Sequence, residues 1–394
     1  MIRSKQDNYQ KDLVWKPLEL YLHIPFCVRK CRYCDFLSGP ADVCTQDGYM
    51  EALLTEMRGR SAECAEYEVD TVFIGGGTPS VVKPEWIQKV MDTIREYYRL
   101  SPEAEITMEM NPGTVSSDGL KVYRKAGINR LSIGLQSANE DELFRIGRIH
   151  TFAQFQKTYR EAVQAGFTNI NVDVMSALPE QTVESWRRTL EAVLALEPIP
   201  QHISAYSLIV EEGTPLYDMQ EQGTLILPDE DSERQMYALT EELLGQYGFR
   251  RYEISNYAGE GYECRHNCGY WRRREYLGLG TGAASLMKEC RFTNGTGMEE
   301  DLKNPLKMRG EVQELTVEEQ MEEFMFLGLR MMEGVSEKTF REAFGRELME
   351  VYGSVIRKNV QDGLLETTEG SPVFYRLTHR GIDLSNYVMS QFLF

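Results

Sequence analysis

Three cysteines close together in the sequence are the residues best suited to hold a metal. Cys27, Cys31 and Cys34 follow one another at a C-x3-C-x2-C spacing, directly after the apolar run 18–24. A loop this tight can turn three thiolates toward one centre, and soft thiolates suit zinc or iron–sulfur clusters. A closed zinc site wants a fourth ligand at regular spacing, and none follows. Three ligands on a four-iron cluster leave one iron open to a small molecule. The alternatives are three free thiols, or a zinc loop that uses a distant ligand.

The elements that must position this loop alternate between strands and helices. Short apolar runs predict strands, and helical spacing of apolar residues predicts the helices between them. The predicted strands are 18–24, 69–74, 105–110, 130–134, 169–175 and 202–208, and the predicted helices are 46–66, 84–98, 117–126, 151–165 and 182–196. This alternation argues for a parallel sheet with crossover helices, which right-handed crossovers roll into a barrel or part of one. In such barrels the chemistry gathers at the carboxyl ends of the strands.

Glycine and polar residues stand at those strand ends. Gly75-Gly76-Gly77-Thr78 follows the second strand and lacks both the Lys-Ser/Thr of a phosphate loop and the spacing of a dinucleotide fingerprint. We expect its glycines to let a ligand approach the backbone closely. Glu109 ends the third strand, Gln136 follows the fourth, and Asp173 lies on the fifth, while Arg148 precedes the next helix. Taken singly, each of these is more often a capped loop or a satisfied buried polar group.

The cysteine spacing after a first strand resembles the signature of the radical S-adenosylmethionine (SAM) proteins. The longer string Tyr21-Leu22-His23-Ile24-Pro25-Phe26-Cys27 is similar to that of the anaerobic coproporphyrinogen III oxidase family and its heme chaperone branch, HemW. The resemblance covers nearly the whole chain from Tyr21 on. It implies an α/β fold with a partial (β/α)6 TIM-like barrel, a [4Fe-4S] cluster on the three cysteines, and SAM as a second cofactor. The positions that match the family's SAM-binding residues are Tyr21, Tyr33, Gly76, Gly77, Thr78, Glu109, Gln136, Arg148 and Asp173.

A second motif, His266-Asn267-x-x-Tyr270-Trp271, looks like the element linked to heme binding in the chaperone branch. Neutral imidazole is a usual axial ligand of heme iron, which makes His266 the candidate heme-binding residue. Arg265 or Arg272 could meet the heme propionates as charge-assisted pairs. The alternative is a hydrogen-bonded loop histidine with core aromatic neighbours. Cys264 and Cys268 form either a weak metal pair or, as is more common, two incidental thiols.

The resemblance leaves three functions to compare. The first is a heme chaperone that binds heme and passes it to acceptor proteins, such as those of a respiratory complex. The second is an oxygen-independent coproporphyrinogen III oxidase, which decarboxylates propionates through a 5′-deoxyadenosyl radical. The third is another radical SAM tetrapyrrole enzyme. The oxidase branch has a further cysteine where this chain has Phe36, so oxidase activity is not expected. Ala177 and Ala284 also depart from the family, which usually has glycine and histidine there.

The composition of the chain limits which binding partners and which cellular compartment we expect. The chain has 394 residues and a formal net charge of -18, so no nucleic-acid partner is expected, and a small acidic ligand is a better candidate. Residues 1–16 lack the apolar core of a signal peptide, and no apolar run is long enough to span a bilayer. Clustered cysteines favour a reducing compartment, so we expect a cytoplasmic protein. Whether two chains form a homodimer, or touch a membrane surface peripherally, is left open.

The predicted organisation has four segments. They are an N-terminal tail (1–16), the radical SAM partial barrel (17–225), a barrel-closing and heme-binding segment (226–310) and a C-terminal domain (311–394). In the last segment, Thr316-x-x-Glu319 predicts a capping box. Helices at 317–332, 336–344, 348–361 and 378–393, with a hairpin from 364–366 and 374–377, predict a small winged-helix-like α+β domain.

Overall fold

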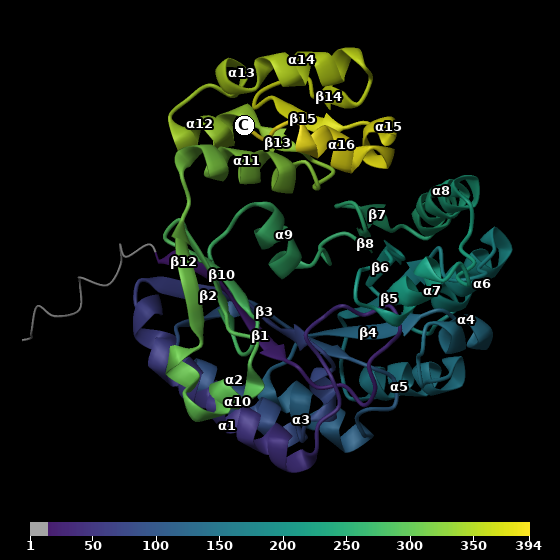
Figure 1. Ribbon diagram of the computed structural model, residues 1–394, viewed down its shortest axis with the longest axis vertical. Helices are drawn as coiled ribbons and strands as arrows, with labels where there is room; N and C mark the ends of the chain where they lie inside the picture. The colour runs from purple at the N-terminus through teal and green to yellow at the C-terminus, as the bar shows by residue number, and fades with distance from the viewer. Residues whose placement is uncertain (1–14) are drawn as a thin grey trace, which may run out of the picture.

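A mixed sheet of twelve strands runs through most of the molecule (Figure 1). The computed structural model describes residues 15–394, so the predicted tail 1–16 lies almost wholly outside the described residues. The order of the strands is β12-β11-β10-β9-β1-β2-β3-β4-β5-β6-β8-β7. None of the described helices combines the length and the apolar character that a membrane span requires.

Six parallel strands form the middle of the sheet, as the strand–helix repeat predicts. They are β1 (Lys16–Ile24), β2 (Tyr67–Gly76), β3 (Leu100–Met110), β4 (Arg130–Gln136), β5 (Ile170–Ser176) and β6 (His202–Ser207). The helices between them are α1 (Val43–Arg60), α2 (Pro84–Tyr97), α3 (Ser117–Ala126), α4 (Glu140–Arg145), α5 (Phe152–Gln164) and α6 (Val183–Leu194). Because β1 pairs with β9 and β6 pairs with β8, instead of with each other, the barrel stays open. The predicted partial (β/α)6 barrel is confirmed.

The two faces of these strands differ in chemistry because successive side chains point to opposite sides of a sheet. Leu18, Leu20 and Leu22 alternate along β1 and belong to one hydrophobic cluster with helix residues such as Met50 and Ile87. The residues between them on the parallel strands are largely polar and bond to one another inside the barrel, as at Ser132–Asp173, Asn171–Asp173 and Asn171–His202. The apolar core therefore surrounds the barrel, and its interior is free for polar site residues.

Short strands, which the sequence did not predict, extend the sheet on both sides; β9 runs parallel to β1, and the others pair antiparallel to their neighbours. On one side are β8 (Asn256–Ala258) and β7 (Arg250–Arg251), and on the other are β9 (Tyr276–Leu279), β10 (Ala284–Met287), β11 (Cys290–Asn294) and β12 (Arg309–Glu314). The helices of this region are α7 (Pro215–Glu221), α8 (Glu230–Gln246), α9 (Arg265–Trp271) and α10 (Met298–Lys303). Figure 1 shows α9 between the parallel strands and the C-terminal helices.

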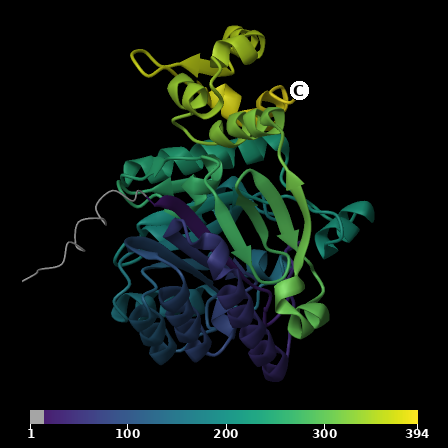
Figure 2. The same ribbon diagram turned by 90° about the vertical axis from the view of Figure 1, so that its left-hand side faces the viewer.

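The C-terminal domain packs around a hydrophobic cluster of its own and stands at one end of the molecule (Figure 2). Its elements are α11 (Val317–Gly328), β13 (Val335–Ser336), α12 (Glu337–Phe344), α13 (Leu348–Val351), α14 (Gly353–Gln361), β14 (Leu365–Thr367), β15 (Phe374–Leu377), α15 (His379–Asp383) and α16 (Ser385–Ser390). Thr316 and Glu319 form the predicted capping box.

The single last helix predicted for 378–393 is wrong. The chain breaks at Leu384, whose φ of -111° and ψ of 26° leave the helical region between α15 and α16. Polar Asp383, Ser385 and Asn386 surround the break, and side chains of these types compete with the backbone for helical hydrogen bonds.

Candidate functional site

The cysteine loop follows the carboxyl end of β1, and backbone hydrogen bonds join its two ends. The Cys27 amide donates to the Gly39 carbonyl at 2.9 Å, and the Gly39 amide donates back to the Pro25 carbonyl at 3.0 Å. Inside the loop, the Cys34 amide donates to the Cys31 carbonyl at 3.4 Å. These backbone bonds fix both ends of the segment, so its three thiols stay on the same side of the barrel.

One cavity of about 320 Å³ collects nearly all the candidate site residues at the carboxyl ends of the strands. The predicted residues that line it are Cys27, Cys31, Cys34, Tyr33, Gly76, Gly77, Thr78, Glu109, Gln136, Arg148 and Asp173. They come from the loops or ends of β1 to β5 and from the segment before α5. The structure therefore brings together residues that span about 150 positions of sequence.

The donor set of the cavity suits a cluster better than a single ion. Among the described residues, no three Cys, His, Asp or Glu side chains surround one point as a lone metal ion would require. A four-iron cluster takes each thiolate on a different iron atom, which spreads the sulfurs apart. The three cysteines carry free, partly exposed thiols. Burial raises the pKa of the Cys34 thiol, so metal binding there must displace a proton.

A hydroxyl and a guanidinium group from neighbouring segments contact two of these sulfurs. Thr78 places its hydroxyl 3.4 Å from the Cys27 sulfur, and an Arg148 nitrogen lies 3.7 Å from the Cys31 sulfur. The Arg148 Nε is buried without a hydrogen-bond partner. An unsatisfied guanidinium nitrogen in a buried site calls for an acceptor, which an anionic sulfur cluster or a carboxylate-bearing ligand supplies. The residues present therefore fit the cluster and cofactor that the sequence predicted.

Two partly buried carboxyl groups give the cavity a preference for cationic ligands. Desolvation, with a contribution from Asp173, raises the pKa of Glu109 to about 8. Desolvation also raises the pKa of Asp173, although Ser132 and Asn171 donate to its oxygens at 2.9 and 2.8 Å. A positive charge bound nearby would favour their ionised forms, and a sulfonium or an ammonium group supplies such a charge.

The glycine run after β2 makes its tightest backbone contact with the chain that leads into the cysteine loop. A Cβ on Gly77 would lie 2.6 Å from the Phe26 carbonyl oxygen, and the Gly77 amide donates to Ile24 at 2.9 Å. The sequence predicted that these glycines serve a ligand. The structure adds that Gly77 also lets two segments of backbone pack together.

Tyr21 faces the barrel interior from β1 but is not among the residues that line the cavity. Its hydroxyl donates to His23 Nδ1 at 3.0 Å. His23 Nε2 must carry the proton because it bonds to the Leu37 carbonyl, 2.9 Å away, and a carbonyl can only accept. Tyr21 therefore holds the histidine that anchors the cysteine loop, and direct contact with a cofactor stays a prediction.

His266 lies toward the opposite end of the barrel from the cysteines. Its Nδ1 bonds to Thr71 at 2.7 Å and its Nε2 bonds to Tyr270 at 3.0 Å, with only 1% of the residue exposed. Thr71 precedes Gly75 by four residues on β2, which corresponds to roughly 13 Å of strand. Burial lowers the pKa of His266 to about 3. This geometry matches the alternative interpretation, a hydrogen-bonded histidine, and the ligand role remains untested.

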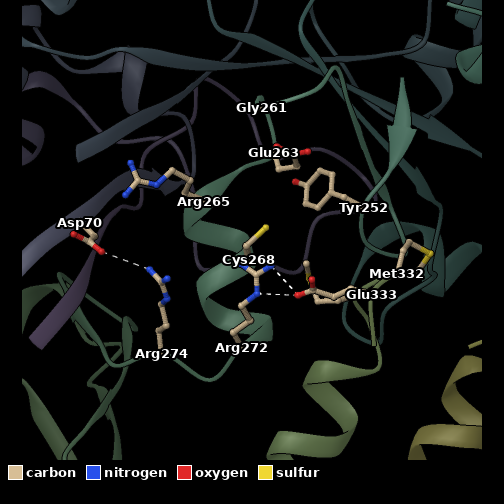
Figure 3. Close-up of a pocket in the computed structure, with 11 residues that line it drawn as sticks. Asp70, Tyr252, Gly261, Glu263, Arg265, Cys268, Arg272, Arg274, Met332 and Glu333 are labelled. Carbon is tan, nitrogen blue, oxygen red and sulfur yellow. Dashed lines mark hydrogen bonds and ion pairs between the residues drawn. The ribbon is translucent and has the colours of Figure 1, made fainter. Parts of the chain in front are cut away.

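The predicted propionate partners line a second cavity, of about 530 Å³, beside α9 (Figure 3). Arg272 pairs with Glu333 at 2.8 Å, and Arg274 pairs with Asp70 at 3.5 Å. Arg265 donates to a backbone carbonyl. Three carboxylates, including Glu263, offset three arginines in this cavity. The site offers little net positive charge to an anionic ligand.

The two thiols near α9 are buried. Burial raises the pKa of Cys268 to about 12 and also raises that of Cys264, so both thiols are protonated at neutral pH. The Cys264 sulfur lies 3.6 Å from a Glu105 oxygen, as a weak donor to a carboxylate. The choice between a weak metal pair and incidental thiols stays a prediction.

Several residues of the cysteine-lined cavity were missed by sequence reasoning. They are Asn111, Ser132, Gly134, Met175 and Tyr206. Asn111 donates to the Thr78 hydroxyl at 2.7 Å and so orients the group that meets Cys27. Tyr206 stands near the end of β6, where the rule that predicted Glu109 and Gln136 applies equally. Phe36 lies at the rim of this cavity and is 63% exposed.

Two family models match the chain, one within the barrel and one in the C-terminal domain. The radical SAM superfamily model matches residues 21–193, and the model of the HemN C-terminal domain matches residues 315–384. The heme chaperone HemW of Bacillus subtilis (strain 168) is 38% identical over 378 residues, which are 95% of this chain and 98% of that protein. The heme chaperone HemW of Escherichia coli (strain K12) is 41% identical over 271 residues, covering 68% of this chain and 69% of that protein.

A solved structure supports the same fold. The coproporphyrinogen III oxidase HemN from Escherichia coli superposes with a TM-score of 0.83 at 22% identity, over 96% of this chain and 90% of that chain. At this level of identity the similarity concerns the arrangement of the elements, and it carries no conclusion about activity.

Proposed function

This chain belongs to the HemW heme chaperone family of the radical SAM superfamily, and on that premise we propose that it binds heme and delivers it to acceptor proteins. The observation that carries the proposal is 38% identity to a heme chaperone along almost the full length of both chains. The oxidase alternative is disfavoured because Phe36 replaces the further cysteine of that branch and because relatives that are 35%, 38% and 41% identical carry the chaperone name.

We propose that Cys27, Cys31 and Cys34 hold a [4Fe-4S] cluster and that SAM occupies the rest of the cysteine-lined cavity. Such a cluster supplies an open iron position and a single electron next to the sulfonium. Glu109 and Asp173 would favour the positive charges of the nucleotide. Arg148 and Thr78 would orient the sulfur ligands through the contacts described above. The remaining residues of the cavity fix its shape.

His266 would have to give up one of its two ring hydrogen bonds inside the barrel to bind iron. We therefore propose that it positions α9 against β2 and β3, where its backbone amide also donates to Glu105 at 3.1 Å. Loss of either bond would leave its partner, Thr71 or Tyr270, without this hydrogen bond in a buried site, which is costly. We infer that the acceptors are hemoproteins. Those of respiratory complexes are the first to test.

Hemin titration tests the proposal. A saturable shift of the Soret band is expected, followed by transfer of the heme from the loaded chain to an apo-hemoprotein in a mixing experiment. Coproporphyrinogen III supplied with SAM and a reductant should remain unconverted. If the chain turns over coproporphyrinogen III and binds no hemin, the oxidase alternative replaces the chaperone function.

A further inference from the structure

The hydroxyl of Thr78 lies between a cysteine sulfur and an amide nitrogen. Its oxygen is 3.4 Å from the Cys27 sulfur, where either atom could be the donor, and it accepts from the Asn111 side-chain nitrogen at 2.7 Å. The three residues belong to different segments: the loop after β1, the glycine run after β2 and the turn after β3. Only 2% of Thr78 is exposed, so these neighbours, and not bulk water, decide where its hydroxyl hydrogen points.

A bound metal would decide which way these hydrogen bonds run. A cysteine that ligates iron is a thiolate, which carries no hydrogen and can only accept. The single hydrogen of the Thr78 hydroxyl must then point to the Cys27 sulfur. The oxygen of that hydroxyl can still accept, and Asn111 is the described residue that donates to it. The Asn111 amide therefore has to present its nitrogen, and not its oxygen, to Thr78.

Contacts of its own backbone hold Asn111 in place after β3. Its main-chain carbonyl accepts from the Thr114 hydroxyl at 2.6 Å and from the Thr114 amide at 3.3 Å. The Thr114 hydroxyl also lies 2.5 Å from that of Ser80, which is buried two positions after Thr78. These bonds join the turn that carries Asn111 to the segment that carries Thr78.

The barrel also fixes the other members of this chain of hydrogen bonds. The Thr78 amide donates at 2.7 Å to the carbonyl of Phe26, the residue before Cys27. The oxygen of the Asn111 amide faces β4, where a Cβ on Gly134 would lie 2.9 Å from it. Because Gly134 has no side chain, the amide fits with its oxygen on this side and its nitrogen toward Thr78.

A hydrogen bond to a ligating sulfur changes how easily a cluster accepts an electron. The sulfur becomes more negative when the cluster is reduced, so a donor stabilises the reduced form more than the oxidised form. Thr78 would supply such a bond to Cys27. Arg148 contacts a different sulfur, that of Cys31, so the two contributions can be measured separately.

We propose that Asn111 is a positioning residue of the cysteine-lined cavity: it fixes the Thr78 hydroxyl as a hydrogen-bond donor to the Cys27 thiolate and so raises the reduction potential of the cluster. The inference rests on the proposed [4Fe-4S] cluster and assigns a role to a residue that the sequence did not indicate. It does not depend on where heme binds.

Redox titration of the anaerobically reconstituted full chain, followed by electron paramagnetic resonance, tests this role. SAM is left out, so that loss of a SAM contact cannot contribute. Thr78→Val removes the donor, and the ratio of reduced to oxidised cluster at a fixed potential should fall by about three- to tenfold, where tenfold corresponds to about 59 mV. Thr78→Ser keeps a hydroxyl and should leave the ratio close to that of the unsubstituted chain. Thr55→Val is the matched control, since Thr55 is an exposed residue of α1 outside the cavity.

Asn111→Ala should shift the ratio in the same direction as Thr78→Val, because a hydroxyl without its partner can turn away from the sulfur. A double variant separates a positioning role from a direct one. In the Thr78→Val background the hydroxyl is absent, so Asn111→Ala should cause no further fall. Additive effects of the two substitutions, or an unchanged ratio in Asn111→Ala, would overturn the proposal.

The outcomes distinguish failure of the cluster from failure of the positioning role. If the folded, unsubstituted chain assembles no cluster, the proposed iron–sulfur site fails and Asn111 loses its role with it. If the cluster forms and all variants have equal potentials, only the positioning role is rejected. Circular dichroism and iron content show whether each variant is folded and loaded. If Thr78→Val holds no iron, the comparison of Asn111→Ala with the unsubstituted chain still decides, because equal ratios reject the role.

Discussion

The Arg148 guanidinium lies 3.7 Å from the sulfur of Cys31, although 117 positions of sequence separate the two residues. A second nitrogen of Arg148 donates to the Gly134 carbonyl at 2.6 Å, at the end of β4. The arginine therefore ties the cysteine loop after β1 to the opposite strands of the barrel. It also sets a fixed positive charge beside the proposed cluster.

Removal of that charge should make the cluster harder to reduce. The extra electron of a reduced cluster is stabilised by a nearby cation and by hydrogen bonds to its sulfurs. Arg148→Met should lower the midpoint potential by tens of millivolts, since about 1 kcal/mol corresponds to roughly 40 mV for one electron. Redox titration followed by electron paramagnetic resonance measures it. Arg145→Met is the control, because Arg145 pairs with Glu180 instead. Equal potentials in the two variants would contradict this role.

The three loop cysteines should each be needed for iron binding. Cys27→Ala, Cys31→Ala and Cys34→Ala should lose the brown chromophore and the iron of the anaerobically reconstituted chain, because a lost thiolate leaves the cluster without one of its protein ligands. Cys44→Ala is the matched control, since Cys44 is an exposed free thiol on α1. A full iron content in any of the three variants would remove that residue from the ligand set.

Because Glu19 is buried, the free energy of unfolding should fall as the pH rises. Its two oxygens have no hydrogen-bond partner in the described structure, and burial raises its pKa from 4.5 to about 9, with Arg274 opposing the shift. Folding then takes up a proton between about pH 4.5 and 9, so the free energy of unfolding declines across that window. Glu19→Gln cannot ionise and should gain on the unsubstituted chain as pH rises, by about 1–3 kcal/mol at pH 9.

Urea unfolding of both proteins at pH 5, 7 and 9 measures this gain. The exposed Glu96→Gln serves as the control because it should show no pH-dependent difference from the unsubstituted chain. A constant difference for Glu19→Gln at all three pH values would show that the carboxyl group is already ionised in the folded protein.

The substitution Ala177→Gly should stabilise the folded protein. It is buried and has a φ of 57°, in the left-handed region that disfavours residues with a Cβ. The strain relieved exceeds the added flexibility of the unfolded chain, so Ala177→Gly should stabilise by about 0.5–1 kcal/mol. Ala192→Gly, within helix α6, should instead destabilise by about 0.5–1 kcal/mol. Thermal unfolding compares the two, and a loss of stability at position 177 would refute the strain argument.

The sequence predicted the barrel because its signals are local and repeated. The first three parallel strands contain apolar runs that are followed by proline, glycine or asparagine, and helices such as α2 and α6 have a regular apolar stripe. The cofactor residues were found for a related reason: parallel strands end at the same edge, so residues such as Glu109 and Gln136 must meet. No such rule distinguishes Tyr21, which lies on the inner face below the cavity.

The missed parts depend on contacts that leave no local signal. Strands β7 to β12 are only two to six residues long, which is too short for alternation to stand out. The tertiary structure as a whole determines that β9 pairs with β1 and that β8 pairs with β6. His266 illustrates the same limit, because its partner Thr71 is 195 positions away and sequence alone could not show that both ring nitrogens are engaged.

The separate hydrophobic clusters of the barrel and the C-terminal domain have a mechanical consequence. Walls that belong to different rigid bodies can part by a slight rotation of one body, whereas strands of a shared sheet cannot separate without breaking their ladder of bonds. The cysteine-lined cavity lies wholly within the barrel, so a change in the position of the C-terminal domain would leave its lining residues in place.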